Sequence, residues 1–419
     1  MQPWREKIFG FFVLCTLEIG EARLFEKLFA AKGRWDVAGL GYKRPHHDLL
    51  NIMFTDTADM RRYQDHCGHN WHQLFEQWEL RQYMAMILRS GVKSVVWKCE
   101  EHCGGLGDRW RGLLSSFMLA LVTDRAFFID NENPVPLRNY FAVANPALHW
   151  VFDNIMLENK TVLHEHIIDS PSIGDYAGAN LSQYDQFDVI VQRNTFYHPF
   201  HILKNDFAIG SMLNKYEDHT LAGCILNYLL VPAKSLQLKI HNTRNSVLET
   251  KGEIIGVQIR TGDGQTKHST VLSGLVKAFD RCVQAITKRS ELPFHLFLTT
   301  DFDNVTSMFQ ATRFNMLTFD GPPFHIDGEF GSPTNLDKAF QKVVLDHLMI
   351  SYSNRVIISR SGFAELAVLR SFQSYFTPVN CHVDKPIQHY SFPEKNPRSV
   401  PSTPKDVESV FSVWDEFDA

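Results

Sequence analysis

Residues 92–130 read VKSVVWKCEEHCGGLGDRWRGLLSSFMLALVTDRAFFID, and this stretch decides the fold. The β-branched run at 92–99 predicts a strand, and the glycines at 104–107 predict a tight turn after it. Apolar residues then recur at spacings of three and four and predict a helix: Trp110, Leu113, Leu114, Phe117 and Leu121. The apolar run AFFID at 126–130 predicts a second strand. Strand, glycine turn, helix and strand are the start of a βαβ unit.

The same alternation begins again after Lys251-Gly252. The predicted strands there are 253–259, 294–299, 315–319 and 355–359, and the main predicted helices are 271–289 and 335–350. Two such stretches imply an α/β protein with two facing Rossmann-like domains, each built on a parallel sheet. The predicted limits are 1–22 for a signal peptide or anchor, 23–90 for a helical arm, 91–248 and 249–392 for the two domains, and 393–419 for a tail.

The composition excludes some classes of protein, and the N-terminal residues bear on the cellular location. Apolar residues make up 44% of the chain, which excludes wholesale disorder, and the net charge of −5 excludes a chain-wide basic footprint for nucleic acid. The apolar run at 8–17 is too short to span a bilayer, so it predicts either a signal peptide or a buried helix start. The seven cysteines include no C-x-x-C pair, so the sequence holds neither a zinc ribbon nor a thioredoxin motif, and disulfides can form if the compartment oxidises. The sequons at Asn159, Asn180 and Asn304 favour a secretory protein.

The first candidate ligand turn is the run CGGLGDR at 103–109. Glycines allow the backbone to approach a ligand closely, and the helix start that follows favours an anion. The candidate binding residues here are Gly104, Gly105, Gly107, Asp108 and Arg109. As a dinucleotide fingerprint the run is incomplete, because Trp110 stands in place of the third glycine. Since Asp130 is suitably placed for a ribose hydroxyl, a nicotinamide-dependent enzyme stays an alternative.

The second turn is GVQIRTGDG at 256–264. Arg260 leaves a buried strand there, and its planar guanidinium suits bidentate capture of a phosphate. Gln258 precedes it on the strand and can hydrogen-bond a base or a ribose. Asp263 either acts in catalysis or forms an ion pair with Arg260 that only fixes the loop.

The third turn is Thr299-Thr300-Asp301, at the end of the next predicted strand. A carboxylate at this position can accept two N–H bonds from a guanine edge, and it can equally cap the following helix. Asp301 and Asp303 also spell D-x-D, a pattern that binds a divalent ion in metal-dependent glycosyltransferases.

The fourth turn is Ser359-Arg360-Ser361-Gly362-Phe363, between a strand and a helix. Two hydroxyls, a glycine and a helix N-terminus form an anion cradle, whereas simple N-capping by Ser361 is the alternative. The stretch HCGHNWH at 66–72 carries three histidines, but its spacing matches no standard zinc pattern.

Taken together, the runs GGLGDRWRG, GVQIRTGDG, FLTTD and SRSGFAELA resemble the fucosyltransferase superfamily over roughly residues 92–375. Its members include the protein O-fucosyltransferases, the α-1,6-fucosyltransferases, the bacterial nodulation-factor enzyme and the plant xyloglucan enzymes. The resemblance implies a GT-B-like fold, GDP-fucose as donor, inversion at the anomeric carbon and no required metal or other cofactor. It further implies a glycan or protein acceptor and a location in the Golgi or ER lumen, with membrane association only through the N-terminus.

The resemblance also assigns roles to residues. Arg260 matches the arginine that holds the donor pyrophosphate, and Asp301 the acidic residue that contacts guanine in some members. Thr300 precedes Asp301 in the same motif. The third motif, at the diphosphate, is matched by Ser359, Ser361, Gly362 and Phe363. Residues 104–109 match the glycine loop of the N-terminal, acceptor-side domain, and Gln258 stands where many members have histidine.

The expected mechanism follows from charge. Arg260 and the helix N-terminus at Ser361 stabilise the leaving diphosphate while an acceptor hydroxyl attacks from the opposite face. Asp108 and Asp263 are the candidate bases for that hydroxyl. The alternatives are another nucleotide-sugar transferase that uses metal through Asp301 and Asp303, an NAD(P)-dependent Rossmann enzyme, or a non-catalytic relative that binds nucleotide or glycan.

Overall fold

The structure is a computed structural model. It describes residues 49–88, 91–100, 103–131, 133–167, 180–195, 218–261, 269–288, 292–310, 315–322, 326, 336–359, 361–373 and 375–376. The predicted signal peptide at 1–22, the predicted tail at 393–419 and Asp263 lie outside the described residues.

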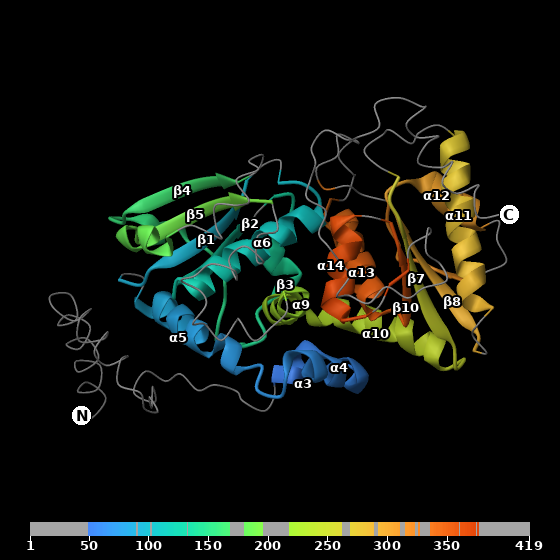
Figure 1. The fold of residues 1–419 in the computed structure, drawn as a ribbon, viewed down its shortest axis with the longest axis horizontal. Helices are drawn as coiled ribbons and strands as arrows, with labels where there is room; N and C mark the ends of the chain where they lie inside the picture. The colour runs from blue at the N-terminus through green and yellow to red at the C-terminus, as the bar shows by residue number, and fades with distance from the viewer. Residues whose placement is uncertain are drawn as a thin grey trace, which may run out of the picture.

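The first sheet has four parallel strands (Figure 1). In spatial order they are β2 (Ala126–Asn131), β1 (Ser94–Cys99), β5 (Val189–Asn194) and β4 (Val162–Ile167). Helix α6 (Leu106–Val122) joins β1 to β2 and packs on β1 and β5. Val95 and Trp97 face the large core beneath α6, while Val96 between them faces a separate apolar cluster on the opposite side. The predicted βαβ unit is confirmed.

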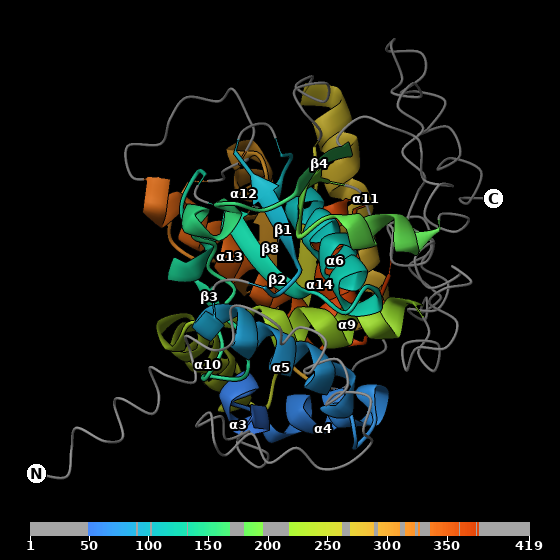
Figure 2. The same cartoon turned by 90° about the vertical axis from the view of Figure 1, so that its left-hand side faces the viewer.

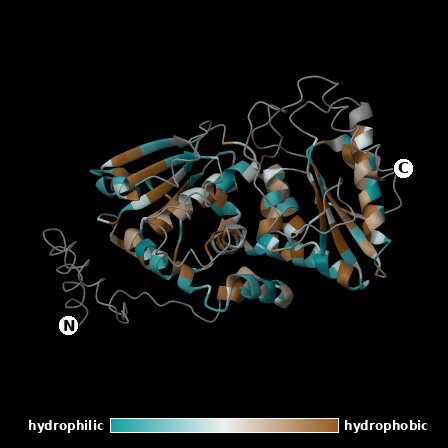
Figure 3. Ribbon diagram, viewed as in Figure 1, coloured by the Kyte–Doolittle hydropathy of each residue, from teal (hydrophilic) through white to brown (hydrophobic). Residues whose placement is uncertain are grey.

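The second sheet is parallel as well. Its strands are, in order, β10 (Arg355–Ile358), β7 (Glu253–Ile259), β8 (Phe294–Thr300) and β9 (Met316–Leu317). One face packs against α13 (Leu336–Tyr352), and the other against α11 (Ser269–Thr287) and α12 (Asp303–Gln310). Figure 3 shows the apolar residues of the strands and helices gathered between these layers. The second predicted parallel domain is therefore present as a sheet covered on both faces.

Helices fill the space between the two sheets (Figure 1). They are α9 (Asp218–Leu229), α10 (Lys234–Leu248), α13 and α14 (Gly362–Ser371), and α14 contacts α6, α9 and α13. A single apolar cluster runs from α6 through α9 to α13 and α14. The two halves consequently share a core, and α10, which precedes the predicted boundary near residue 248, already packs on α13 and β7.

The N-terminal arm is helical, as predicted, over its described part. It comprises α3 (Leu49–Met53), α4 (Thr57–Cys67) and α5 (Gln73–Leu88). Both views place α3 and α4 beside the helices that join the halves (Figures 1 and 2), and a disulfide between Cys67 and Cys224 ties α4 to α9. Because Cys67 is bonded in this way and His66 stacks on Phe372, the stretch 66–72 forms no metal site with these two residues.

Disulfides recur elsewhere in the chain. Cys99 pairs with Cys103, just before the glycine turn, and Cys282 is disulfide-bonded as well. Disulfides persist in oxidising compartments, which favours the secretory location; that location stays a prediction, which fractionation of cells expressing the chain tests. Among the described residues, no helix is long and apolar enough to span a bilayer.

Gly112 sets how closely α6 approaches the first sheet. A Cβ at this position would lie 1.6 Å from the carbonyl oxygen of Asn194 on β5. Close packing of helix on strand, which the dinucleotide fingerprint assigns to its third glycine, is thus achieved at Gly112, two residues after Trp110. Trp110 itself is buried against the ring of His347.

We expect Gly112→Ala to lower the free energy of unfolding by about 3 kcal/mol, because α6 must move away from β5 to accommodate a methyl group. Gly274, exposed on α11, is the matched control, since a Cβ there meets nothing within 4 Å. Gly274→Ala should raise stability by about 1 kcal/mol through helix propensity. Urea denaturation measures both, and an unchanged midpoint for Gly112→Ala would contradict the close contact.

Candidate functional site

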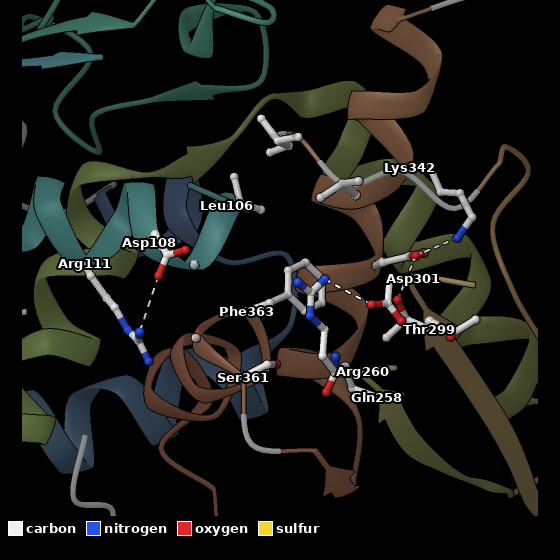
Figure 4. Close-up of a pocket in the computed structure, with 17 residues that line it drawn as sticks. Leu106, Asp108, Arg111, Gln258, Arg260, Thr299, Asp301, Lys342, Ser361 and Phe363 are labelled. Atoms are coloured by element: carbon white, nitrogen blue, oxygen red, sulfur yellow. Dashed lines mark hydrogen bonds and ion pairs between the residues drawn. The ribbon is translucent and has the colours of Figure 1, made fainter. Parts of the chain in front are cut away.

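The four turns predicted from the sequence meet at one cavity of about 270 Å³ (Figure 4). Its wall is formed by the N-termini of α6 and α14, the carboxyl ends of β7 and β8, and one side of α13. Of the predicted residues it contains Gly105, Gly107, Asp108, Gln258, Arg260, Thr300, Asp301, Ser361, Gly362 and Phe363. Residues from both halves of the chain therefore share one opening at the carboxyl edge of the second sheet, where parallel α/β proteins bind ligands.

Three predicted residues support this wall from behind. Arg109 is buried and donates to the carbonyl oxygens of Gly104 (3.0 Å) and Asn133 (2.7 Å), and to Sγ of Cys99. Ser359 Oγ accepts from the backbone N–H of Arg260 at 2.8 Å and donates to the carbonyl of Gln258. Arg109 and Ser359 thus fix the two turns, and Gly104 provides the left-handed backbone, φ 76°, that the first turn requires.

Arg260 is held by Asp301. Nη1 of Arg260 lies 3.1 Å from one oxygen of Asp301, while the other oxygen accepts from N (2.8 Å) and Oγ1 (2.9 Å) of Thr261. Both carboxylate oxygens of Asp301 are therefore engaged with the arginine turn. The sequence also offered Asp263 as a partner of Arg260; Asp263 lies outside the described residues, so that pairing stays a prediction.

The cavity wall beside Asp301 carries a buried ionic group that sequence reasoning missed (Figure 4). Lys342 Nζ donates to Asp346 Oδ2 at 2.5 Å, and Oγ1 of Thr299 donates to the same oxygen at 2.9 Å. Burial raises the pKa of Asp346, against the opposing effects of Lys342 and Thr299. A signal was available: a lysine and an aspartate four residues apart lie within the apolar stripe of the predicted helix 335–350.

Two acceptor atoms at this wall lack a hydrogen-bond partner among the described residues. They are Oδ1 of Asp346 and Oε1 of Gln258, and both side chains are more than nine-tenths buried. Gln258 is paired in register with Thr299, so the two acceptors lie on adjoining parts of the wall. A buried acceptor without a donor is costly, which indicates that a ligand or water supplies N–H or O–H groups here.

His347 is a supporting residue behind the wall. Its Nδ1 donates to the carbonyl of Phe363 at 3.1 Å, and burial, with the nearby charge of Arg370, holds its pKa well below the usual value. His347 is therefore neutral at pH 7 and fixes the first turn of α14 rather than exchanging protons.

The geometry of the described residues gives little support to a metal-dependent transferase or to a nicotinamide-dependent enzyme. Among the described residues, no three His, Cys, Asp or Glu side chains form a group that could hold a metal ion, and nothing is described for the side chain of Asp303. Asp130, which the nicotinamide alternative places on a ribose, pairs with Lys98 at 3.4 Å and is not part of the described cavity wall.

Comparison with known proteins identifies the fold. No protein-family model matches the chain, and no curated protein matches it in sequence. A point variant of Arabidopsis thaliana FUT1, solved in complex with GDP, superposes with a TM-score of 0.53 at 15% identity, covering 80% of this chain and 79% of that one. This chain shares its GT-B-like fold with that structure. The GT-B-like arrangement of two facing Rossmann-like halves with a helical arm is thereby confirmed.

Two further fucosyltransferases are similar at lower scores. NodZ from Bradyrhizobium has a TM-score of 0.42 at 14% identity, over 66% of this chain and 92% of that one. POFUT1 in complex with GDP-fucose has a TM-score of 0.36 at 11% identity, over 68% of this chain and 97% of that one.

Proposed function

We propose that the chain is an inverting glycosyltransferase that moves L-fucose from GDP-fucose to a hydroxyl group of a glycan or protein. The observation that carries this proposal is the shared cavity, in which Arg260 and the N-termini of two helices surround a space at the carboxyl edge of the second sheet. The fucosyltransferase fold, seen with GDP in the Arabidopsis thaliana protein, supports the choice of donor.

The diphosphate belongs at the arginine and the helix N-termini. As the bond from fucose to phosphate breaks, negative charge grows on the leaving GDP. The guanidinium of Arg260 and the free N–H groups at Ser361 and Gly362 offer positive charge and donors that need no rearrangement, an effect often worth several kcal/mol. No metal ion is required for this role, and we propose that the donor binds without one.

The guanine base of the donor belongs at the part of the wall formed by Asp346, Gln258 and Lys342. A guanine presents two neighbouring donors, N1–H and the 2-amino group, beside the acceptor O6. Asp346 Oδ1 and Gln258 Oε1 are acceptors without a hydrogen-bond partner among the described residues, so they suit the two donors of guanine. The ammonium of Lys342 lies beside Asp346. We assign guanine recognition to Asp346 rather than to Asp301, because Asp301 already holds Arg260 and Thr261.

The acceptor side is assigned to α6. Asp108 lines the cavity from the first turn of that helix and keeps about a quarter of its side chain exposed, 27%. Its carboxylate is placed to accept the proton of an attacking hydroxyl, although a loose transition state needs little help from a base.

A thermal-shift panel tests the donor directly. In the presence of EDTA, GDP at 100 times its dissociation constant should raise the melting temperature by about 3 °C, whereas UDP, ADP and NAD should have much smaller effects. Stabilisation by NAD, or by UDP as strongly as by GDP, would overturn the assignment. Release of GDP from GDP-fucose with a panel of glycan acceptors then separates an enzyme from a relative that only binds.

A further inference from the structure

An ion pair joins the two helices whose N-termini line the cavity. Arg111, in the second turn of α6, contacts the carboxylate of Glu365 on α14 through Nη2 and lies 3.4 Å from Asp108 through Nη1. Glu365 is only 1% exposed, and Arg111 is itself part of the cavity wall. The pair therefore crosses the contact between the two halves of the protein next to the proposed donor site.

The helix N-termini beside this pair touch through glycines. A Cβ on Gly107 would lie 2.3 Å from the carbonyl carbon of Gly362 and 2.4 Å from the amide nitrogen of Phe363. A Cβ on Gly362 would lie 2.8 Å from Cζ of Arg111. No side chain fits between the helices at either glycine, so at Gly107 the two backbones are in direct contact. A small movement of one helix opens this contact.

Bringing two helix N-termini together is electrostatically unfavourable without an anion. Each carries roughly half a positive charge, so the two repel one another, and the guanidinium of Arg111 adds a third positive group. The acids in the first turn of each helix, Asp108 and Glu365, offset that charge. Glu365 reaches from α14 across to Arg111 on α6, while Asp108 contacts Arg111 within α6.

We propose that Arg111 and Glu365 form a positioning pair, which holds the N-termini of α6 and α14 at the spacing at which both act on one diphosphate. The proposal rests on the proposed function in taking a diphosphate as the ligand. Arg111 in this role acts through the two helices, with its guanidinium committed to Glu365 and Asp108 instead of to the phosphate.

Glu365→Gln tests the proposal, because simple electrostatics and loss of the positioning pair predict opposite changes in the affinity for pyrophosphate. Removing a negative charge next to an anion site should tighten anion binding if simple electrostatics governs it. Loss of the positioning pair instead lets the helix N-termini separate, and we expect pyrophosphate to bind about tenfold more weakly. Isothermal titration with pyrophosphate and with GDP, on the full chain well below its melting temperature, measures both effects.

Asp59→Asn is the matched control. Asp59 is a second buried carboxylate with an arginine partner, 2.5 Å from Nη1 of Arg244, and it lies on α4 outside the cavity wall. This variant should lose stability like Glu365→Gln while its dissociation constant for pyrophosphate stays within twofold of the wild-type value. Arg111→Lys keeps the positive charge but not the planar guanidinium. Its affinity for pyrophosphate should therefore lie between those of the wild type and Glu365→Gln.

The outcomes separate the two proposals. Unchanged or tighter pyrophosphate binding by Glu365→Gln overturns the positioning pair, and so does equal weakening in Asp59→Asn. A wild-type chain that binds pyrophosphate but not GDP overturns the proposed donor and leaves the pair supported or refuted by the variants. Failure of the wild type to bind either anion overturns both.

Discussion

Arg260→Ala is expected to reduce the rate of fucose transfer at least a hundredfold. Removing one preorganised group that stabilises developing charge typically costs 10²- to 10³-fold. Arg260 also lies within 3.1 Å of Asp301, so its loss leaves that carboxylate facing the cavity without its cation. The measurement is steady-state release of GDP from GDP-fucose.

Arg355→Ala is the control for this substitution. Arg355 begins β10, at the amino edge of the same sheet, and pairs with Glu253 at 3.2 Å, far along the strands from the cavity. It should retain near wild-type turnover, since a partly exposed ion pair of this kind contributes little to stability. Full activity in Arg260→Ala would remove the arginine from the mechanism, and with it the proposed position of the diphosphate.

Asp346→Asn is expected to remove discrimination between GDP and inosine diphosphate, which differ only in the 2-amino group of the base. In the wild type a carboxylate oxygen free to accept from that amino group should favour GDP about tenfold or more. An asparagine places an amide in the same space and leaves Lys342 without its counter-ion, so GDP affinity falls as well. Titration with both nucleotides gives the ratio.

The ratio of the two dissociation constants, for GDP and for inosine diphosphate, is not affected by a general loss of stability, because the same variant binds both nucleotides. Asp301→Asn provides the comparison: it disturbs the arginine turn and should weaken both nucleotides while leaving their ratio near the wild-type value. If Asp301→Asn abolishes the preference for GDP and Asp346→Asn keeps it, guanine recognition belongs to Asp301, as the family resemblance implies.

Local sequence patterns predicted much of the site. The glycines at 104–107, the arginine after β7, the Thr-Thr-Asp after β8 and the Ser-Gly at the start of α14 all occur at strand-to-helix turns. Turns at the carboxyl ends of parallel strands meet along one edge, so order along the chain already implies proximity in space. The cavity contains ten of these predicted residues for that reason.

Partners distant in the chain were not predictable in the same way. Asp301 lies 41 residues beyond Arg260 in the sequence, yet its carboxylate reaches the guanidinium because β7 and β8 are neighbours in register. Arg109 was expected at the ligand, but it turns behind the glycine loop to satisfy backbone carbonyls. Lys342 and Asp346 follow no recognised motif; only the packing of α13 across the sheet brings them to the wall.

By itself, then, the sequence determined the alternation of strands and helices, the two parallel sheets and the chemistry available at each turn, because periodicity and turn residues act over short distances. The tertiary structure alone decided that Asp301 reaches Arg260, that Asp346 keeps an oxygen without a partner among the described residues, and how closely α6 and α14 approach. These depend on strand register and helix packing, where a shift of an ångström at one glycine changes every contact across the cavity.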